Sequence, residues 1–150
     1  MGIRLKSELG NRPSPDVNYI RSLYTVGMIN ILIVDEEAGT RKGLRMWLST
    51  EADFIVAGET GDGWEAMQLV RDLQPDVVVT DIQLPGMDGI ALTERLHRDF
   101  PRCAVIILSL YDDQSNHERA KKVGASAFIS KKKPNGELIE AIRKSARISK

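Results

Sequence analysis

The sequence predicts a doubly wound α/β fold, in which a parallel sheet is covered by helices on both faces. Five short apolar runs recur along the chain, as expected for buried parallel strands. Between them, apolar residues recur at helical spacing, most clearly at Ala66, Leu69, Val70 and Leu73, which follow the pattern i, i+3, i+4, i+7. The expected strands are residues 31–34, 54–57, 77–79, 104–108 and 127–129.

Helix-ending residues and apolar residues at helical spacing indicate five helices between and after these strands. Pro75 ends the second helix and Pro101 closes the third, because proline disfavours helical backbone in the residue before it. Gly124 is expected as the C-cap of the fourth helix. The apolar positions of the remaining helical faces are Leu44, Trp47 and Leu48, then Leu92 and Leu96, then Ala120 and Val123, and finally Leu138, Ala141 and Ile142.

Length and composition limit the class of protein. A chain of 150 residues is one ordinary domain with room for a sizeable core. Its 21 basic and 21 acidic residues balance, so no overall field attracts nucleic acid or an anionic membrane. No apolar run is long enough to span a bilayer. Cys103 is the only cysteine, which excludes an intramolecular disulfide and favours a reducing compartment. We therefore expect a cytoplasmic protein with no membrane contact and no direct nucleic-acid contact.

Residues 1–28 differ from the rest, and we expect them to form a mobile N-terminal extension. The string RPSPD at residues 12–16 is typical of turns and interrupts any helical pattern. Met28 lies just before the first strand, and residues 29–150 are the expected folded domain. The extension is mildly basic, with Arg4, Lys6, Arg12 and Arg21 against Glu8 and Asp16.

The polar residues that end the strands are candidates for a functional site. A doubly wound sheet places its site beyond the carboxyl ends of its strands, where the strand order reverses. The candidates are Asp35 and Glu36 after strand one, Asp81 after strand three, Ser109 at the end of strand four, and Lys131 after strand five. Strands one and three are neighbours in this topology, so we expect their carboxylates to converge.

Converging carboxylates repel, and each raises the pKa of the other unless a cation lies among them. Mg²⁺ suits such a site, because it prefers oxygen ligands and keeps water molecules that a phosphate can displace. A carboxylate beside this ion can attack phosphorus and form an aspartyl phosphate. A nearby lysine and hydroxyl would then hold the phosphoryl oxygens. The strand ends therefore indicate phosphoryl chemistry.

Four strings, in this order and spacing, carry a resemblance to a known family. They are IVDE at residues 33–36, TDIQLPGMDG at 80–89, ILS at 107–109 and GASAFISK at 124–131. With them the chain resembles a bacterial two-component response-regulator receiver domain over residues 30–147. The second string is highly specific, whereas any other string alone is weak. The resemblance implies a flavodoxin-like sheet with the strand order 2-1-3-4-5.

The resemblance assigns a role to each candidate of the phosphoryl site. It implies that Asp81 is the phosphoacceptor, and that Ser109 and Lys131 stabilise the phosphoryl group. A histidine kinase or a phosphotransfer protein would be the donor. The implied Mg²⁺ ligands are Asp35, Glu36, Asp81 and the backbone carbonyl of Gln83.

A switch that links the site to a distant surface is also implied by the resemblance. Phosphorylation would draw Ser109 and its loop toward the new oxygens, and Phe128 would rotate into the space left behind. The alternative for Phe128 is simple core packing. The surface made by the fourth helix, fifth strand and fifth helix would then repack, and it is a candidate homodimer face.

Three positions depart from the commonest family pattern. Glu36 stands where aspartate is frequent, and its extra methylene changes the distance or the directness of its contact with the metal. Leu110 follows Ser109 where a small residue is common, and its bulk would narrow access for a phosphoryl group. Lys132 follows Lys131 where many relatives have proline, so no cis turn is expected there. This last feature resembles NarL/FixJ-type receivers.

Two other functions compete with the phosphorylated switch. One is a degenerate receiver that acts as a phosphorylation-independent interaction module, for which Glu36 and Leu110 leave room. The other is a phosphohydrolase with an aspartate nucleophile, but Gln83 stands where those enzymes usually carry a second acid. We expect no enzymatic activity beyond the domain's own phosphorylation and dephosphorylation. The output is expected to be a downstream protein or a DNA-binding domain outside this chain.

Several other side chains are expected to have ordinary structural roles. Asp88 is expected to cap the third helix rather than bind metal. His117 and Lys132 are expected to be solvated. Cys103 opens an apolar strand and is expected to be packed rather than reactive.

Overall fold

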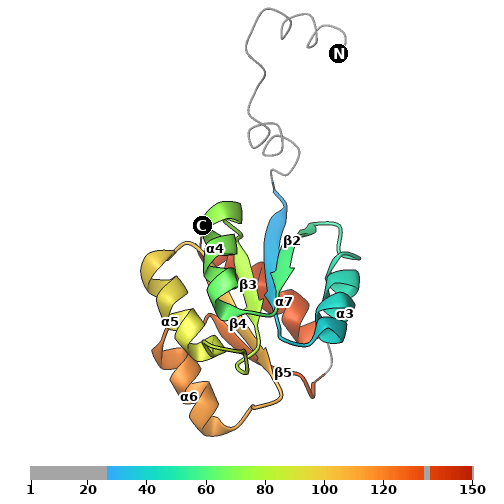
Figure 1. The fold of residues 1–150 in the computed structure, drawn as a ribbon. Helices are drawn as coiled ribbons and strands as arrows, with labels where there is room; N and C mark the ends of the chain where they lie inside the picture. The colour runs from blue at the N-terminus through green and yellow to red at the C-terminus, as the bar shows by residue number, and fades with distance from the viewer. Residues whose placement is uncertain (1–26, 134–135, 150) are drawn as a thin grey trace, which may run out of the picture.

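The computed structural model describes residues 27–133 and 136–149 (Figure 1). The expected N-terminal extension, residues 1–28, lies outside these ranges except for Gly27 and Met28. No helix within the described ranges is long and apolar enough to cross a membrane.

Five parallel strands form one sheet in the order β2-β1-β3-β4-β5, which confirms the predicted topology (Figure 1). The order reverses between β1 and β3, the neighbours from which the two halves of the sheet extend in opposite directions. The strands are β1 (Ile29–Val34), β2 (Phe54–Thr60), β3 (Val77–Thr80), β4 (Ala104–Ser109) and β5 (Ala127–Ser130).

Strand β2 extends three residues beyond its predicted end at Ala57. Gly58, Glu59 and Thr60 pair with the second half of β1, after a register shift between Ile31 and Leu32. The apolar pattern stops at Ala57, but backbone pairing needs no apolar side chain, so the strand continues.

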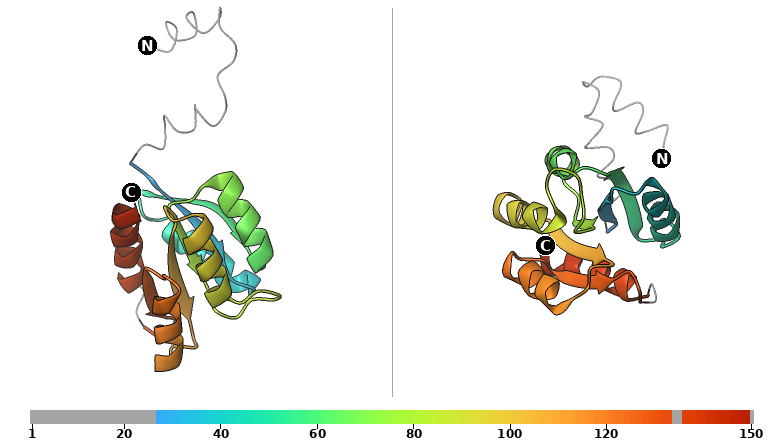
Figure 2. Two further views of the ribbon diagram at one scale, coloured as in Figure 1. Left: turned by 90° about the vertical axis from the view of Figure 1, so that its left-hand side faces the viewer. Right: turned by 60° about the horizontal axis from the view of Figure 1, so that its bottom comes forward.

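The helices lie on both faces of the sheet, as Figure 2 shows. Alternate residues of each strand point to opposite faces. Ile31, Ile33 and Ile106 belong to the core cluster under α3 and α7, whereas Leu32 and Val105 belong to the cluster under α4 and α5. The helices are α3 (Ala38–Leu48), α4 (Gly63–Leu73), α5 (Gly89–Asp99), α6 (Gln114–Lys122) and α7 (Gly136–Ser149).

Helix α6 is the least embedded of these elements. Ala120 is its one buried residue, and a small cluster with Ile90 and Ile107 holds it on the same face as α5. Cys103 lies in the core under α5, as predicted, and burial raises the pKa of its thiol to about 12. This thiol therefore stays protonated at neutral pH.

Aspartates cap the first turns of α4, α5 and α6, and residues with positive φ follow α4 and α6. Asp88 caps α5 as predicted, because its Oδ1 accepts a hydrogen bond of 2.7 Å from the backbone N–H of Ala91. Gly124 takes a φ of +100° just after α6. The N–H of Ala125 reaches back to the carbonyl of Ala120, as in a Schellman motif.

Gly89, the first residue of α5, lies against the backbone of the loop that follows β3. A Cβ at this position would be 1.9 Å from the carbonyl oxygen of Asp81 and 2.9 Å from the Cα of Ile82. The Gly89 N–H also donates to the Ile82 carbonyl at 2.7 Å. Only glycine allows α5 to begin this close to the end of β3.

We expect Gly89→Ala to lower the free energy of unfolding by about 2 kcal/mol or more, because the new methyl group meets backbone that cannot move aside alone. Urea unfolding would measure the change. Gly43→Ala is the matched control, since nothing lies within 4 Å of its Cβ position on α3. Alanine there should stabilise the protein by up to about 1 kcal/mol. Equal effects at the two glycines would contradict the close-approach explanation.

Candidate functional site

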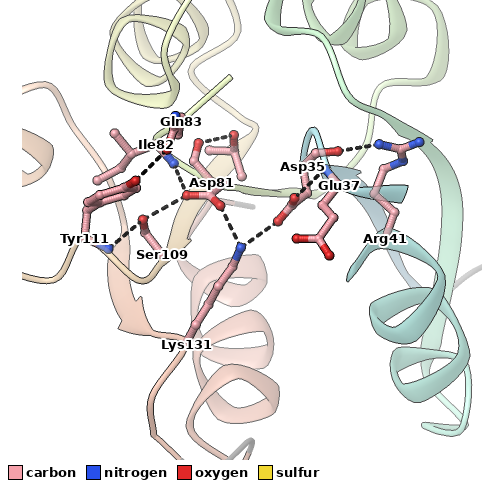
Figure 3. Close-up of polar contacts among 10 residues, drawn as sticks. Asp35, Glu37, Arg41, Asp81, Ile82, Gln83, Ser109, Tyr111 and Lys131 are labelled. Atoms are coloured by element: carbon pink, nitrogen blue, oxygen red, sulfur yellow. Dashed lines mark hydrogen bonds and ion pairs between the residues drawn. The ribbon is translucent and has the colours of Figure 1, made fainter. Parts of the chain in front are cut away.

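Four strand ends bring the candidate residues together at the carboxyl edge of the sheet (Figure 3). Asp35 follows β1, Asp81 follows β3, Ser109 ends β4 and Lys131 follows β5. The register pairs Val34 with Thr80, the residues just before the two aspartates, so their side chains start from neighbouring positions. The predicted convergence of the carboxylates is thus confirmed.

Lys131 bridges the two aspartates. Its Nζ donates hydrogen bonds to Asp81 Oδ2 at 2.6 Å and to Asp35 Oδ2 at 2.8 Å. The side chain of Lys131 is 18% exposed and that of Asp35 is 5% exposed, so water screens these charges weakly. Burial alone lowers the pKa of Lys131, but the hydrogen bonds and negative charges of both aspartates outweigh it, and the pKa is raised.

Asp81 uses both of its carboxylate oxygens. Oδ2 accepts from Lys131, while Oδ1 accepts from the Ser109 hydroxyl at 2.8 Å and from the Ile82 N–H at 2.6 Å. Ser109 is fully buried. Its hydroxyl is expected from sequence to be drawn in by a phosphoryl group, yet it already contacts the free carboxylate. The group that could bind a phosphoryl oxygen is therefore positioned beforehand.

Asp35 is fixed by its own backbone surroundings. Its Oδ1 accepts from the Glu37 N–H at 3.0 Å, and its carbonyl accepts from Arg41 Nη1 at 2.5 Å. Glu36, by contrast, is exposed. The two adjacent acids therefore differ, since Asp35 is held in the site and Glu36 lies at its edge.

A cavity of about 640 Å³ opens beside Asp81 and Lys131. Glu36, Gln83 and Leu110 line it as well. Leu110 is 54% exposed and leaves Asp81 accessible from this cavity. A small phosphorylated molecule or a phosphorylated side chain can thus approach the carboxylate.

Tyr111 is a site residue that the sequence reasoning missed. Its hydroxyl donates to Gln83 Oε1 at 2.7 Å, and its N–H donates to the Ser109 hydroxyl at 3.1 Å (Figure 3). Gln83 is predicted to bind metal through its backbone carbonyl, and its side chain accepts this hydrogen bond from Tyr111. The sequence feature that could have identified Tyr111 is its position, two residues after Ser109 on the loop that leaves the sheet.

His117 is not solvated as predicted. It is half-buried and its ring stacks on Phe128, with 4.0 Å between centroids and 25° between planes. Phe128 itself is half-buried and packs against the small cluster under α6. The polar sequence around His117 concealed a contact that a neighbouring strand supplies. The rings connect α6 directly to β5.

The donor set fits Mg²⁺. In the parts of the chain that the structure describes, no three His, Cys, Asp or Glu residues gather as a metal site. Asp35 and Asp81, however, both contact one cationic nitrogen, so the space between them accommodates positive charge. Mg²⁺ in phosphate-handling sites commonly has one or two carboxylate ligands and completes its shell with water and phosphate.

A flavodoxin-like sheet that carries an aspartate pair, a hydroxyl and a lysine at its carboxyl edge is the architecture of a receiver domain. The family model of the response regulator receiver domain matches residues 31–143. The chain therefore belongs to this family of two-component signalling domains, as its sequence predicts.

Individual relatives agree with this assignment. The response regulator protein VraR of Staphylococcus saprophyticus is 34% identical over 116 residues, which is 77% of this chain and 56% of that protein. The transcriptional regulatory protein DegU of Brevibacillus brevis is 35% identical over 115 residues, 77% of this chain and 49% of DegU. The chain thus spans about half the length of these relatives.

Solved structures give the same result. The receiver domain of response regulator NarL from Mycobacterium tuberculosis superimposes with a TM-score of 0.75 at 27% identity. The match covers 80% of this chain and 97% of that one. The predicted resemblance to NarL-type receivers is confirmed, and the peptide bond between Lys131 and Lys132 is trans, as expected.

We expect Lys131→Met to lower the free energy of unfolding at neutral pH by about 2–4 kcal/mol, because it leaves two facing carboxylates without their cation. The pKa of Lys131 is raised above its ordinary value of 10.5. Its stabilisation is therefore complete below 10.5 and is lost as the pH rises through the higher folded-state value. Chemical unfolding at several alkaline pH values would show the two proteins converging.

The exposed Lys133→Met is the matched control and should change stability by less than about 0.5 kcal/mol. If the free energies of unfolding of wild type and Lys131→Met differ by the same amount at all alkaline pH values, the ion pairs of Lys131 are not the cause of the difference.

Proposed function

We propose that this domain is a phosphorylation-dependent signalling switch that accepts a phosphoryl group on Asp81 from a histidine kinase or a phosphotransfer protein in the cytoplasm. The observation that carries the proposal is the environment of one carboxylate. Asp81 faces an open cavity while Lys131 and Ser109 each donate a hydrogen bond to it. A nucleophile and two groups that can hold phosphoryl oxygens thus occupy one site.

The proposed reaction needs no further side chain as a nucleophile. One Asp81 carboxylate oxygen attacks phosphorus, the new P–O bond forms, and the P–N bond to the donor imidazole breaks. The electron pair of that bond leaves with the imidazole. Lys131 and the Ser109 hydroxyl supply positive charge and a hydrogen bond to the transferred group, whose charge exceeds that of the carboxylate.

Mg²⁺ is the proposed cofactor. Asp35 and Asp81 would hold it, and Glu36 and the backbone carbonyl of Gln83 are the remaining ligands implied by the family. When bound, the ion neutralises carboxylate and phosphoryl charge at the site. The exposure of Glu36 favours a contact through water, because its carboxylate starts at the edge of the cavity.

We propose that Ser109 and Phe128 pass the change to the surface of α6, β5 and α7. Because Ser109 already contacts Asp81, the movement would begin in the loop after Ser109 rather than with the hydroxyl itself. Phe128 can turn only if its stacking with His117 changes, so α6 would move with it. A downstream protein, a DNA-binding output domain or a second copy would read this surface.

Two observations favour the degenerate receiver as the second candidate. Glu36 is exposed at the edge of the cavity, and Tyr111 and Gln83, which also line the cavity, form a hydrogen bond with each other. A phosphohydrolase gains no such support, because Gln83 is engaged with Tyr111 at the position where a second acid would act. We propose no enzymatic role beyond turnover of the domain's own aspartyl phosphate.

Incubation with a small-molecule phosphodonor and Mg²⁺ should add one phosphoryl group, read by intact mass. Asp81→Asn should add none, because its amide is no nucleophile and keeps a similar shape. Asp35→Asn should slow the reaction at least about tenfold by weakening Mg²⁺ binding. Removal of Mg²⁺ with a chelator should have a similar effect in wild type.

Glu36→Gln is the informative control, since an acid that acts through water should matter less than Asp35. A wild-type protein that gains no mass under any of these conditions would support the degenerate interaction module. Addition that persists in Asp81→Asn would place the acceptor elsewhere.

We propose homodimerisation through the α6–β5–α7 face after phosphorylation. Strand β5 is an edge strand, and a groove between β5 and α7 is lined by exposed Glu140 and Lys144. Light scattering with and without phosphodonor should show a larger mass with it. Lys144→Glu should weaken the dimer about tenfold by placing like charges in the interface. Glu65→Lys, at an exposed position on α4, should leave the affinity of the dimer unchanged. If both variants weaken the dimer equally, the α6–β5–α7 face is not the dimer interface.

A further inference from the structure

A side chain outside the phosphoryl site connects the two loops that form it. Asp112 lies in the loop between β4 and α6, and its Oδ2 accepts a hydrogen bond of 2.7 Å from the Ser130 hydroxyl. Ser130 is buried and is the last residue of β5, directly before Lys131. The contact therefore joins the loop that follows Ser109 to the residue that precedes the site lysine.

The Ser130 hydroxyl has a second partner, which continues the connection. It accepts a hydrogen bond of 3.1 Å from the N–H of Lys132. The ammonium of Lys132, which is expected from sequence to be solvated, lies 3.6 Å from Asp112 Oδ1 although the side chain is 66% exposed. The hydrogen bond from Ser130 and the charge of Lys132 lower the pKa of Asp112, so it is ionised at neutral pH.

The strand register places this contact between the two groups that bind Asp81. Ser109 and Ser130 are paired residues of β4 and β5. The Lys131 N–H donates to the Ser109 carbonyl at 3.0 Å, so the backbones already touch where the strands end. Beyond that point the chains separate into two loops. Asp112 joins these loops through the Ser130 hydroxyl and, at longer distance, the Lys132 ammonium. Lys131 lies on one loop, and Ser109 begins the other.

Asp112 does not cap the N-terminus of α6, because the next residue, Asp113, has that role. Asp113 is the N-cap of α6, and its Oδ1 accepts from the N–H of Asn116 at 2.9 Å. Asp112 instead points back toward the sheet. Its partner therefore indicates a function in the arrangement of the site rather than in helix initiation.

We propose that Asp112 and Ser130 form a latch that positions Ser109 and Lys131 relative to each other, and that Asp112 is thus a positioning residue for the phosphoryl group. This role rests on the proposed phosphorylation of Asp81. With the latch closed, the hydroxyl and the ammonium stay at the separation at which both reach one carboxylate. With it open, the loops move independently, and the two groups hold the phosphoryl oxygens less well.

Two truncations and two conservative variants test the latch. Asp112→Ala and Ser130→Ala remove it, and each should slow phosphorylation by a small-molecule phosphodonor about five- to tenfold, the net effect of about one ordinary hydrogen bond. The double variant should be no slower than either single one, because both remove the same contact. Ser130→Thr and Asp112→Asn keep a donor and an acceptor and should restore most of the rate.

Asp113→Ala separates positioning from stability. It removes the neighbouring helix cap, so it should lower the thermal midpoint without slowing phosphorylation. Amide hydrogen exchange of the Lys132 N–H in the unphosphorylated protein gives a readout that needs no phosphoryl transfer. It should be faster in Ser130→Ala and unchanged in Asp113→Ala.

The outcomes distinguish this proposal from the function on which it rests. A wild-type protein that takes no phosphoryl group overturns the proposed function and the positioning role with it. If wild type is phosphorylated on Asp81 and both truncated variants react at the same rate, only the latch is overturned. If Asp113→Ala is phosphorylated as slowly as Asp112→Ala, the latch is also overturned, because general loosening of α6 would then explain both rates.

Discussion

The ammonium of Lys131 between two aspartates is the interaction on which the rest of the site depends. Two carboxylates with little exposure would repel each other and be costly to keep ionised without a cation between them. The three groups come from the ends of β1, β3 and β5, so the bridge can form only if these strands end at one edge. Because all five strands run parallel, their carboxyl ends lie at one edge and provide that arrangement.

The remainder of the fold holds the strand ends in place. Apolar side chains alternate between two helical layers, so each central strand is fixed from both faces. Gly89 lets α5 begin against the backbone of Asp81, and the backbone around Asp35 is held by Arg41. The loops after β4 and β5 are joined to each other by the contact between Asp112 and Ser130.

Apolar periodicity predicted the five strands and five helices, because it follows local rules, and strand-end chemistry predicted the convergence of Asp35 and Asp81. The strand order and the places of Ser109 and Lys131 in the site came from the resemblance to receiver domains. Sequence reasoning missed features that depend on neighbours distant in the chain. Strand β2 continues past its apolar residues because β1 offers backbone partners. His117 lies among polar residues, yet Phe128 of β5 covers its ring. Tyr111 has no motif of its own, and only the folded loop brings it to Gln83.

The shallow anchoring of α6 affects how the molecule fluctuates. A helix that buries a single alanine gains little free energy from docking, whereas its neighbours rest on broad apolar clusters. Native proteins open first where few apolar contacts resist, in cooperative units well below the global unfolding free energy. By this criterion α6 is the helix whose detached states we expect to be the most populated. A chemical event at the strand ends needs only to change the weight of those states, and need not force a rigid body to move.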